Sequence, residues 1–144
     1  ENETRLRHYG NIKTIENTLN IKYSFNANMN INTRIRHYWS NVKYNDFFTL
    51  QNDGSLEENS TYNENKNQNL NFFNIDMVYT WQIAPGSFVN VVWKNAVTDF
   101  RQITVDSYFK NLNNTMKIED NNNISFKIIY FLDYLQLKNF KKKK

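Results

Sequence analysis

Four arginines are the clearest candidates for a binding site in this sequence. They lie in two copies of nearly the same hexapeptide. "TRLRHY" covers Thr4–Tyr9 and "TRIRHY" covers Thr33–Tyr38. In each copy an aliphatic residue separates two arginines, so in an extended strand the arginines share one face and the aliphatic residue takes the other. Guanidinium groups bind anions, or they pair with carboxylates of the same protein. The repeat therefore predicts a basic face on a β-sheet.

Other candidates for catalysis or metal binding are few. The sequence has two histidines and no cysteine, which excludes thiolate nucleophiles and thiolate metal sites. A metal ion bound at His8 or His37 would need further histidine or carboxylate ligands nearby. Glu57 and Glu58 lie in a polar segment, where a solvated loop is expected rather than a glycosidase pair. Neither a glycine-rich phosphate loop nor a G-x-S-x-G elbow occurs, so we expect no enzyme, no metal and no cofactor.

The charge balance argues against a nucleic-acid partner. The net charge is +4, but four of the positive charges form the tail Lys141–Lys144. Without this tail the chain is close to neutral, whereas a general polyanion binder is usually more basic. In "RIRHYW" the alternation places the arginines and Trp39 on opposite faces, which argues against one shared surface for stacking bases.

Alternating apolar and polar residues predict the strands that position these side chains. The expected apolar face comprises Leu19, Ile21, Ile31, Ile35, Ile75, Met77, Val91, Ile128 and Tyr130. Basic residues in the opposite phase form the expected basic cluster, namely Arg5, Arg7, Lys22, Arg34 and Arg36. His37 and Trp39 fall in the apolar phase. The pattern indicates an all-β antiparallel meander of about six strands, each of about 10–12 residues.

The expected connections alternate in length. Asn26–Asn28 and Ala84–Ser87 read as short turns, whereas residues 45–69 and 97–123 read as long polar loops. Gly10–Ile15 reads as a further turn, which would place the two hexapeptides on strands separated by a third. A short helix is expected within residues 97–123, with Asp106 as its N-cap. Short turns at one end and long loops at the other are typical of outer-membrane barrels.

Aromatic residues near strand ends favour the same interpretation. Aromatics make up 16% of the sequence, against 3 glycines and 1 proline. Those expected at the two lipid–water interfaces are Trp39, Trp81, Trp93, Tyr23 and Tyr130. A soluble β-sandwich that binds carbohydrate remains the alternative, because alternation alone does not distinguish a lipid-facing side chain from a core side chain. We expect the apolar face to contact lipid.

The basic cluster then faces the barrel lumen, because an arginine in lipid at the bilayer midplane costs about 2–4 kcal/mol. In an open lumen it would favour anions. In a plugged or narrow lumen, which we favour, the arginines would pair with carboxylates such as Asp76 and Asp133.

Three segments resemble a known family. They are "RHYWSNVKYNDFFTLQNDGSL" (Arg36–Leu56), "FNIDMVYTWQIAPGSFVNVVWKN" (Phe73–Asn95) and "ISFKIIYFLDY" (Ile124–Tyr134). They are similar to the C-terminal part of a large family of Gram-negative proteins of unknown function. Its members carry an N-terminal carbohydrate-binding-like β-sandwich and a long C-terminal region similar to outer-membrane barrels. The resemblance implies that residues 1–140 are the C-terminal barrel strands of a longer protein and that residues 141–144 are a lysine tail.

Together these observations predict a non-enzymatic segment of an outer-membrane β-barrel in a Gram-negative bacterium. Its role is expected to be structural, transport or surface binding. Outer-membrane lipid is the expected partner of the strands. The two long loops are expected to be extracellular, where they meet a surface glycan or another outer-membrane protein.

Overall fold

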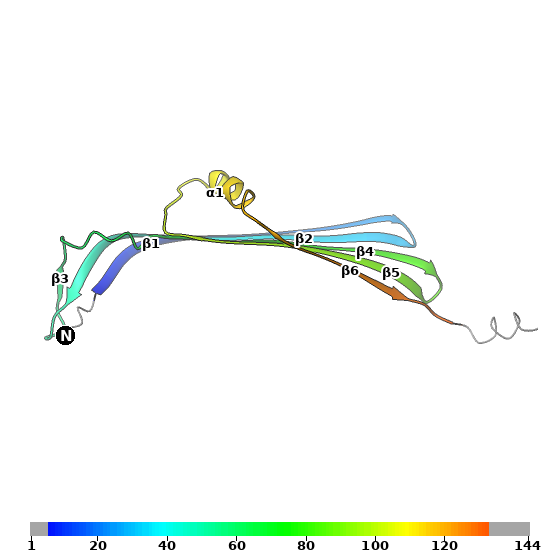
Figure 1. The fold of residues 1–144 in the computed structure, drawn as a ribbon, viewed down its shortest axis with the longest axis horizontal. Helices are drawn as coiled ribbons and strands as arrows, with labels where there is room; N and C mark the ends of the chain where they lie inside the picture. The colour runs from blue at the N-terminus through cyan, green and yellow to red at the C-terminus, as the bar shows by residue number, and fades with distance from the viewer. Residues whose placement is uncertain (1–5, 133–144) are drawn as a thin grey trace, which may run out of the picture. The chain divides into compact units, whose positions relative to one another are not determined.

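The computed structural model describes residues 6–132, which form one antiparallel sheet of six strands and one short helix (Figure 1). The elements are β1 (Leu6–Asn26), β2 (Met29–Leu50), β3 (Leu56–Glu58), β4 (Gln68–Ala84), β5 (Ser87–Arg101), α1 (Tyr108–Thr115) and β6 (Asn121–Ile129). The sheet order is β1-β2-β4-β5-β6, and β3 pairs with β2 off this path, with Thr49 opposite Glu57. The predicted all-β class and the predicted count of about six strands are therefore confirmed. The predicted strand length of about 10–12 residues is wrong for β1, β2, β4 and β5, which have 21, 22, 17 and 15 residues.

The two outer strands, β1 and β6, leave the sheet with open edges. Among residues 6–132 they are the ends of the strand order and do not pair with each other, so the sheet is not closed into a barrel. An edge strand presents a row of unpaired backbone N–H and C=O groups. Both edges are therefore able to accept a further strand.

The chain divides into two compact units, each described here by itself. Unit 1 comprises Glu1–Thr18, Arg36–Phe73 and Ala96–Asp120. Unit 2 comprises Leu19–Ile35, Asn74–Asn95 and Asn121–Lys144. The long connections and α1 fall in unit 1, whereas the two short turns fall in unit 2.

The short turns of unit 2 are where the sequence predicts them. Ala27 and Asn28 join β1 to β2, and the backbone N–H of Asn28 donates to Asn26 Oδ1 at 2.8 Å. Pro85 and Gly86 join β4 to β5, and Gly86 adopts a φ of +75°, which glycine takes without steric cost. Local turn chemistry thus explains both connections.

The expected turn at Gly10–Ile15 is wrong, because β1 runs through it without interruption. A Cβ atom built on Gly10 would lie 2.5 Å from the carbonyl oxygen of Lys43. The glycine therefore permits a close approach of β1 to β2 rather than a change of direction. As a result, residues 6–9 of the first hexapeptide and the whole of the second lie on neighbouring strands, and not on strands separated by a third.

The two segments predicted as long loops contain more regular structure than expected. β2 continues to Leu50 and β5 to Arg101, which shortens both connections. Phe47 explains part of the difference, because its ring contacts Tyr62 at 4.8 Å and His8 at 5.3 Å between centroids. These contacts come from residues distant in sequence, so a weak local alternation does not reveal them.

A helix forms within residues 97–123 as predicted, but it begins one residue later than expected. Its N-cap is Ser107, whose side chain makes no capping hydrogen bond, rather than Asp106. Asn111 and Thr115 are the buried residues of α1. Within residues 6–132 no helix is both long enough and apolar enough to span a bilayer.

Candidate functional site

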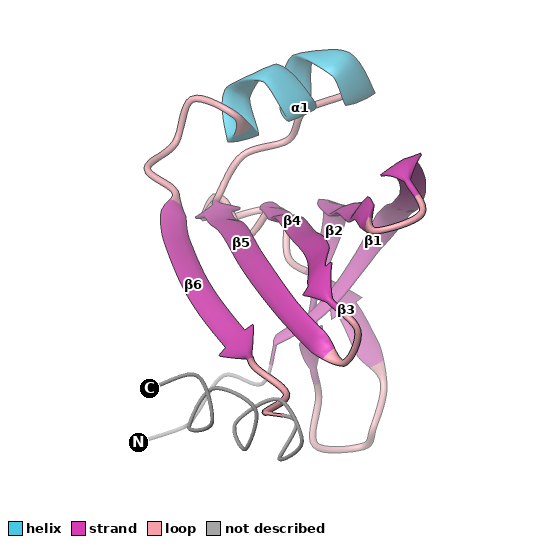
Figure 2. Cartoon of the chain, turned by 90° about the vertical axis from the view of Figure 1, so that its right-hand side faces the viewer, coloured by secondary structure: helices cyan, strands magenta, loops and turns pink. Residues whose placement is uncertain are grey.

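A buried polar cluster joins α1 to the strands of unit 1. Figure 2 shows α1 lying over the sheet. The cluster comprises His37, Trp39, Asn69, Asn71, Asp99 and Asn111. β2 contributes the two aromatic rings, β4 two of the amides, β5 the carboxylate and α1 the third amide. Trp39, Asn69, Asn71 and Asn111 have no exposed surface. The helix therefore contacts the sheet largely through polar groups.

Each amide of this cluster has a partner on another element. The Trp39 Nε1–H donates to Asn69 Oδ1 at 2.6 Å, and Asn69 Nδ2 donates to Asn111 Oδ1 at 3.0 Å. Asn111 Nδ2 in turn donates to Asn71 Oδ1. Asn71 Nδ2 donates to Asp99 Oδ2 at 3.4 Å. Buried polar groups stabilise a fold when they are satisfied in this way, and the network joins α1 to β2, β4 and β5.

Arg101 pairs with the oxygen of Asp99, Oδ2, that also accepts from Asn71. The guanidinium Nε and Nη2 donate to the same oxygen of Asp99, at 2.9 and 2.6 Å. Asp99 is only 6% exposed. A buried carboxylate is costly unless it is paired, so Arg101 supplies the charge that Asp99 requires.

His37 connects the same cluster to Tyr108 of α1. Its Nδ1 lies 3.0 Å from Tyr108 Oη, and its Nε2 lies 3.4 Å from Asn71 Oδ1. Tyr108 Oη also accepts a hydrogen bond of 2.9 Å from Asn17 Nδ2. Burial lowers the pKa of His37, because desolvation disfavours the imidazolium, and the hydrogen bond to Asn71 partly opposes this shift. The geometry suits a neutral imidazole that holds α1 against the sheet through Tyr108.

The expected positions of His37 and Trp39 on an exposed apolar face are wrong. His37 is 3% exposed and Trp39 is completely buried, because α1 and its polar residues cover this face of β2. A signal for this cluster was present in the sequence. Asn69 and Asn71 alternate in phase with Phe73, and Asp99 alternates in phase with Val97, so polar residues occupy positions of the buried phase.

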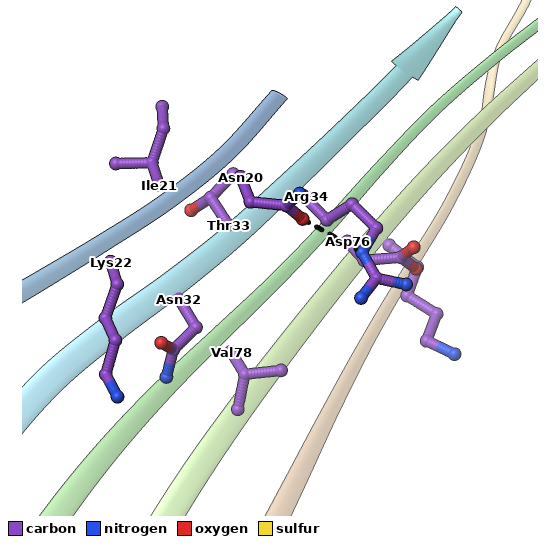
Figure 3. A pocket seen from close by; sticks show the side chains of 9 residues that line it. Asn20, Ile21, Lys22, Asn32, Thr33, Arg34, Asp76 and Val78 are labelled. Carbon is purple, nitrogen blue, oxygen red and sulfur yellow. Dashed lines mark hydrogen bonds between the residues drawn. The ribbon is translucent and has the colours of Figure 1, made fainter. Parts of the chain in front are cut away.

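A basic groove lies in unit 2 and forms the main candidate binding site (Figure 3). Its volume is about 570 Å³. The lining residues are Asn20, Ile21, Lys22, Asn32, Thr33, Arg34, Asp76, Val78 and Lys94. Three of these side chains are cationic and one is a carboxylate, so positive charge dominates. Arg34 Nε donates to Asn20 Oδ1 at 3.1 Å, which orients the guanidinium.

The structure brings together part of the predicted basic cluster. Lys22 and Arg34 line the groove, whereas Arg7 and Arg36 belong to unit 1 and Arg5 lies outside the described residues. Sequence reasoning missed Lys94 as a member. Its signal was the alternation of "SFVNVVWKN", in which Lys94 takes the phase opposite to Val91 and Trp93. Asp76 lines the groove, while Asp133 lies outside the described residues.

Comparison with known proteins identifies a family. The family model described as Domain of unknown function (DUF5916) matches residues 3–141. The chain belongs to this family. Neither the curated proteins nor the solved structures contain a significant match. This match confirms the predicted membership of a family of unknown function.

The aromatics predicted at interfaces take different environments in this DUF5916 domain. Trp81, Tyr23 and Tyr130 are exposed, at 43%, 58% and 63%. Trp93 is half-buried and its Nε1–H donates to Asn122 Oδ1 at 3.0 Å. Trp39 is the exception, since it is fully buried in unit 1. Four of the five predicted positions therefore present part of their ring to the surroundings.

None of the residues predicted on the apolar face is buried in a core. Leu19, Ile21, Ile128 and Tyr130 are exposed. The half-buried members are Ile31, Ile35, Ile75, Met77 and Val91. All nine belong to unit 2, which also holds the basic groove.

Proposed function

We propose that this domain forms C-terminal strands of an outer-membrane β-barrel in a Gram-negative bacterium. Its role in the proposal is structural, transport or surface binding, and it performs no catalysis. The strand segments of unit 2 are the proposed membrane-spanning part, and the long connections of unit 1 face the outside. Outer-membrane lipid is the partner of the strands, and a surface glycan or another outer-membrane protein is the partner of the connections.

The exposed apolar side chains of unit 2 carry the proposal. On β6, Ile124, Phe126 and Ile128 are exposed by 61%, 72% and 70%. Burying an apolar side chain of this size is worth about 1.5–3 kcal/mol, so leaving several in water forfeits much stability. β6 has nine residues, and a tilted membrane strand takes roughly 9–11. Lipid would cover these side chains.

The open edges of the sheet support a larger assembly of strands. β1 and β6 each offer unpaired backbone groups, and barrels remove such edges by closing the sheet. A closed barrel needs about eight strands or more. The proposal therefore requires that both edges pair with other strands of the full-length protein.

A soluble carbohydrate-binding β-sandwich is the alternative function. A sandwich buries its apolar face against a second sheet. All the strands within residues 6–132 belong to a single sheet, so the apolar side chains of unit 2 would need a cover from elsewhere. No described residue supplies that cover, and we therefore favour the membrane proposal.

Cell fractionation of the full-length protein, together with two neighbouring substitutions on β6, tests the proposal. Phe126 and Ser125 are both exposed, and they belong to opposite phases of the strand. A soluble protein would tolerate an arginine at either position. In a barrel, Phe126→Arg should lower the level of folded protein in the outer membrane, since arginine facing lipid costs up to about 2–4 kcal/mol. Ser125→Arg should leave that level close to wild type.

Two results would contradict the membrane proposal. The first is recovery of the full-length wild-type protein in the soluble fraction without detergent. The second is an equal level of folded protein in the outer membrane for both variants, because that would mean that Phe126 does not face lipid.

A further inference from the structure

Positive charge converges on the groove of unit 2 from three strands. Lys22 stands on β1, Arg34 on β2 and Lys94 on β5. Asp76 of β4 is the single carboxylate among the lining residues. Like charges repel at close range, so a surface that gathers three cations around one carboxylate gains free energy by taking up an anion.

The groove also contains hydrogen-bond donors that are available to a ligand. The side chains of Lys22 and Lys94 make no hydrogen bond and no ion pair with any residue in the described range 6–132. Arg34 uses Nε for Asn20, and a guanidinium carries five N–H donors, so its terminal nitrogens can serve a ligand (Figure 3). The contact with Asn20 fixes the plane of the guanidinium, which reduces the entropy lost on binding.

The size and the remaining lining residues narrow the class of ligand. A volume of about 570 Å³ matches a small organic molecule rather than a polymer. Asn32 adds a polar donor and acceptor, while Val78 adds a small apolar area. Two lysines and one arginine suit an oxyanion with more than one negative charge, because ammonium and guanidinium groups both bind phosphate oxygens.

We propose that this groove binds a phosphate-bearing ligand. The inference goes beyond the proposed function, because a groove of this charge would bind the same group whether or not the sheet stands in a membrane. A free solute and a lipid headgroup both carry such a phosphate. Lys22 and Lys94 supply the charge, and Arg34 supplies directed hydrogen bonds.

Calorimetry on the purified full-length protein tests this proposal in two arms. Inorganic pyrophosphate represents the free solute, and phosphatidylglycerol vesicles represent the headgroup. The wild type should bind at least one of them, and binding should weaken as salt is raised. The double variant Lys22→Gln with Lys94→Gln should lose about 10-fold or more in affinity, since each lysine contributes a charge-assisted hydrogen bond.

Matched variants separate charge from folding. Lys22→Arg with Lys94→Arg keeps both charges and should retain most of the affinity. Lys127→Gln removes an exposed lysine of β6 that does not line the groove, and should bind like wild type. Circular dichroism should show that all variants keep the β-sheet.

The arm that responds identifies the source of the phosphate. Binding of pyrophosphate that disappears in the double glutamine variant assigns a solute, and vesicle binding that disappears in the same variant assigns a headgroup. Absence of wild-type binding in both arms overturns the proposal. Binding that is unchanged in the double glutamine variant also overturns it. Neither result depends on where the protein fractionates, so this proposal and the membrane proposal can fail separately.

Discussion

The indole nitrogen of Trp39 donates a 2.6 Å hydrogen bond to Asn69 Oδ1, and both side chains are completely buried. Tryptophan has a single polar hydrogen, so Asn69 satisfies the only donor of this ring. Asn69 also donates to Asn111 of α1, and its amide thereby joins the indole to the helix. The pair fastens β2 and β4 to the element that covers them.

Replacing Asn69 by leucine should destabilise the domain. The variant leaves the Trp39 N–H without an acceptor, and an unsatisfied buried donor costs about 1–3 kcal/mol. Denaturant unfolding of the full-length protein, followed by circular dichroism, measures this loss. The double variant Trp39→Phe with Asn69→Leu should recover part of it, because the orphaned donor is then removed. An Asn69→Leu protein as stable as wild type would contradict the assignment of this bond.

The two sides of α1 should respond differently to substitution. Asn111 faces the sheet and bonds to Asn69 and Asn71, whereas Phe109 is 78% exposed. Asn111→Ala should cost about 1–3 kcal/mol of unfolding free energy, because it leaves both sheet amides with a missing partner. Phe109→Ala is the matched control and should change stability by about 0.5 kcal/mol or less. A larger loss from Phe109→Ala would mean that α1 is fastened by its other face.

His37 should make the stability of unit 1 depend on pH. His37 lies outside the proposed membrane-spanning segments, and burial lowers its pKa in the folded state. The unfolded chain, with an ordinary histidine pKa of about 6.5, therefore takes up a proton at a higher pH than the folded chain does. The unfolding free energy should be highest above about pH 6.5 and fall as pH decreases toward the lower folded pKa.

Unfolding of wild type and His37→Gln between about pH 7.5 and pH 5 checks this dependence. The variant should lose stability overall, because the ring bonds to Tyr108 and Asn71, but its unfolding free energy should vary less with pH. Asn71, which bonds to this ring, also bonds to Asp99, and Asp99 is paired with Arg101. His8→Gln controls for the loss of a histidine elsewhere in the chain. An equal pH slope in wild type and His37→Gln would show that another group is responsible.

Proteolysis of intact cells should reveal the orientation of the domain. Glu64 and Glu119 are exposed and lie in connections, whereas Glu16 lies within β1. A glutamate-specific protease should cut at Glu64 or Glu119 first, because a protease needs an extended backbone that is free of sheet hydrogen bonds. Mass spectrometry of the fragments identifies the cut. Protection of both sites in intact cells, with cleavage only after lysis, would reverse the proposed orientation.

Local patterns in the sequence predicted much of the sheet. Alternation placed Ile21 opposite Lys22 correctly (Figure 3), because a strand turns successive side chains to opposite faces. The turn at Pro85–Gly86 followed from the φ angles that these residue types prefer. The same reasoning wrongly predicted a turn at Gly10. A glycine can indicate either a turn or a close approach of two strands, and only the position of Lys43 distinguishes the two.

The sequence by itself therefore determined the all-β class, the two short turns of unit 2 and the phase that sets Lys22 and Arg34 on the polar side. Only the tertiary structure decided that α1 covers His37 and Trp39, and that Lys94 joins the groove. The physical reason is how far apart in the sequence the contacting residues lie. Periodicity and turn preferences arise from neighbours along the chain, whereas Trp39 meets Asn69 from 30 residues away and Asn69 meets Asn111 from 42. Such contacts depend on strand order and helix placement, which no local pattern encodes.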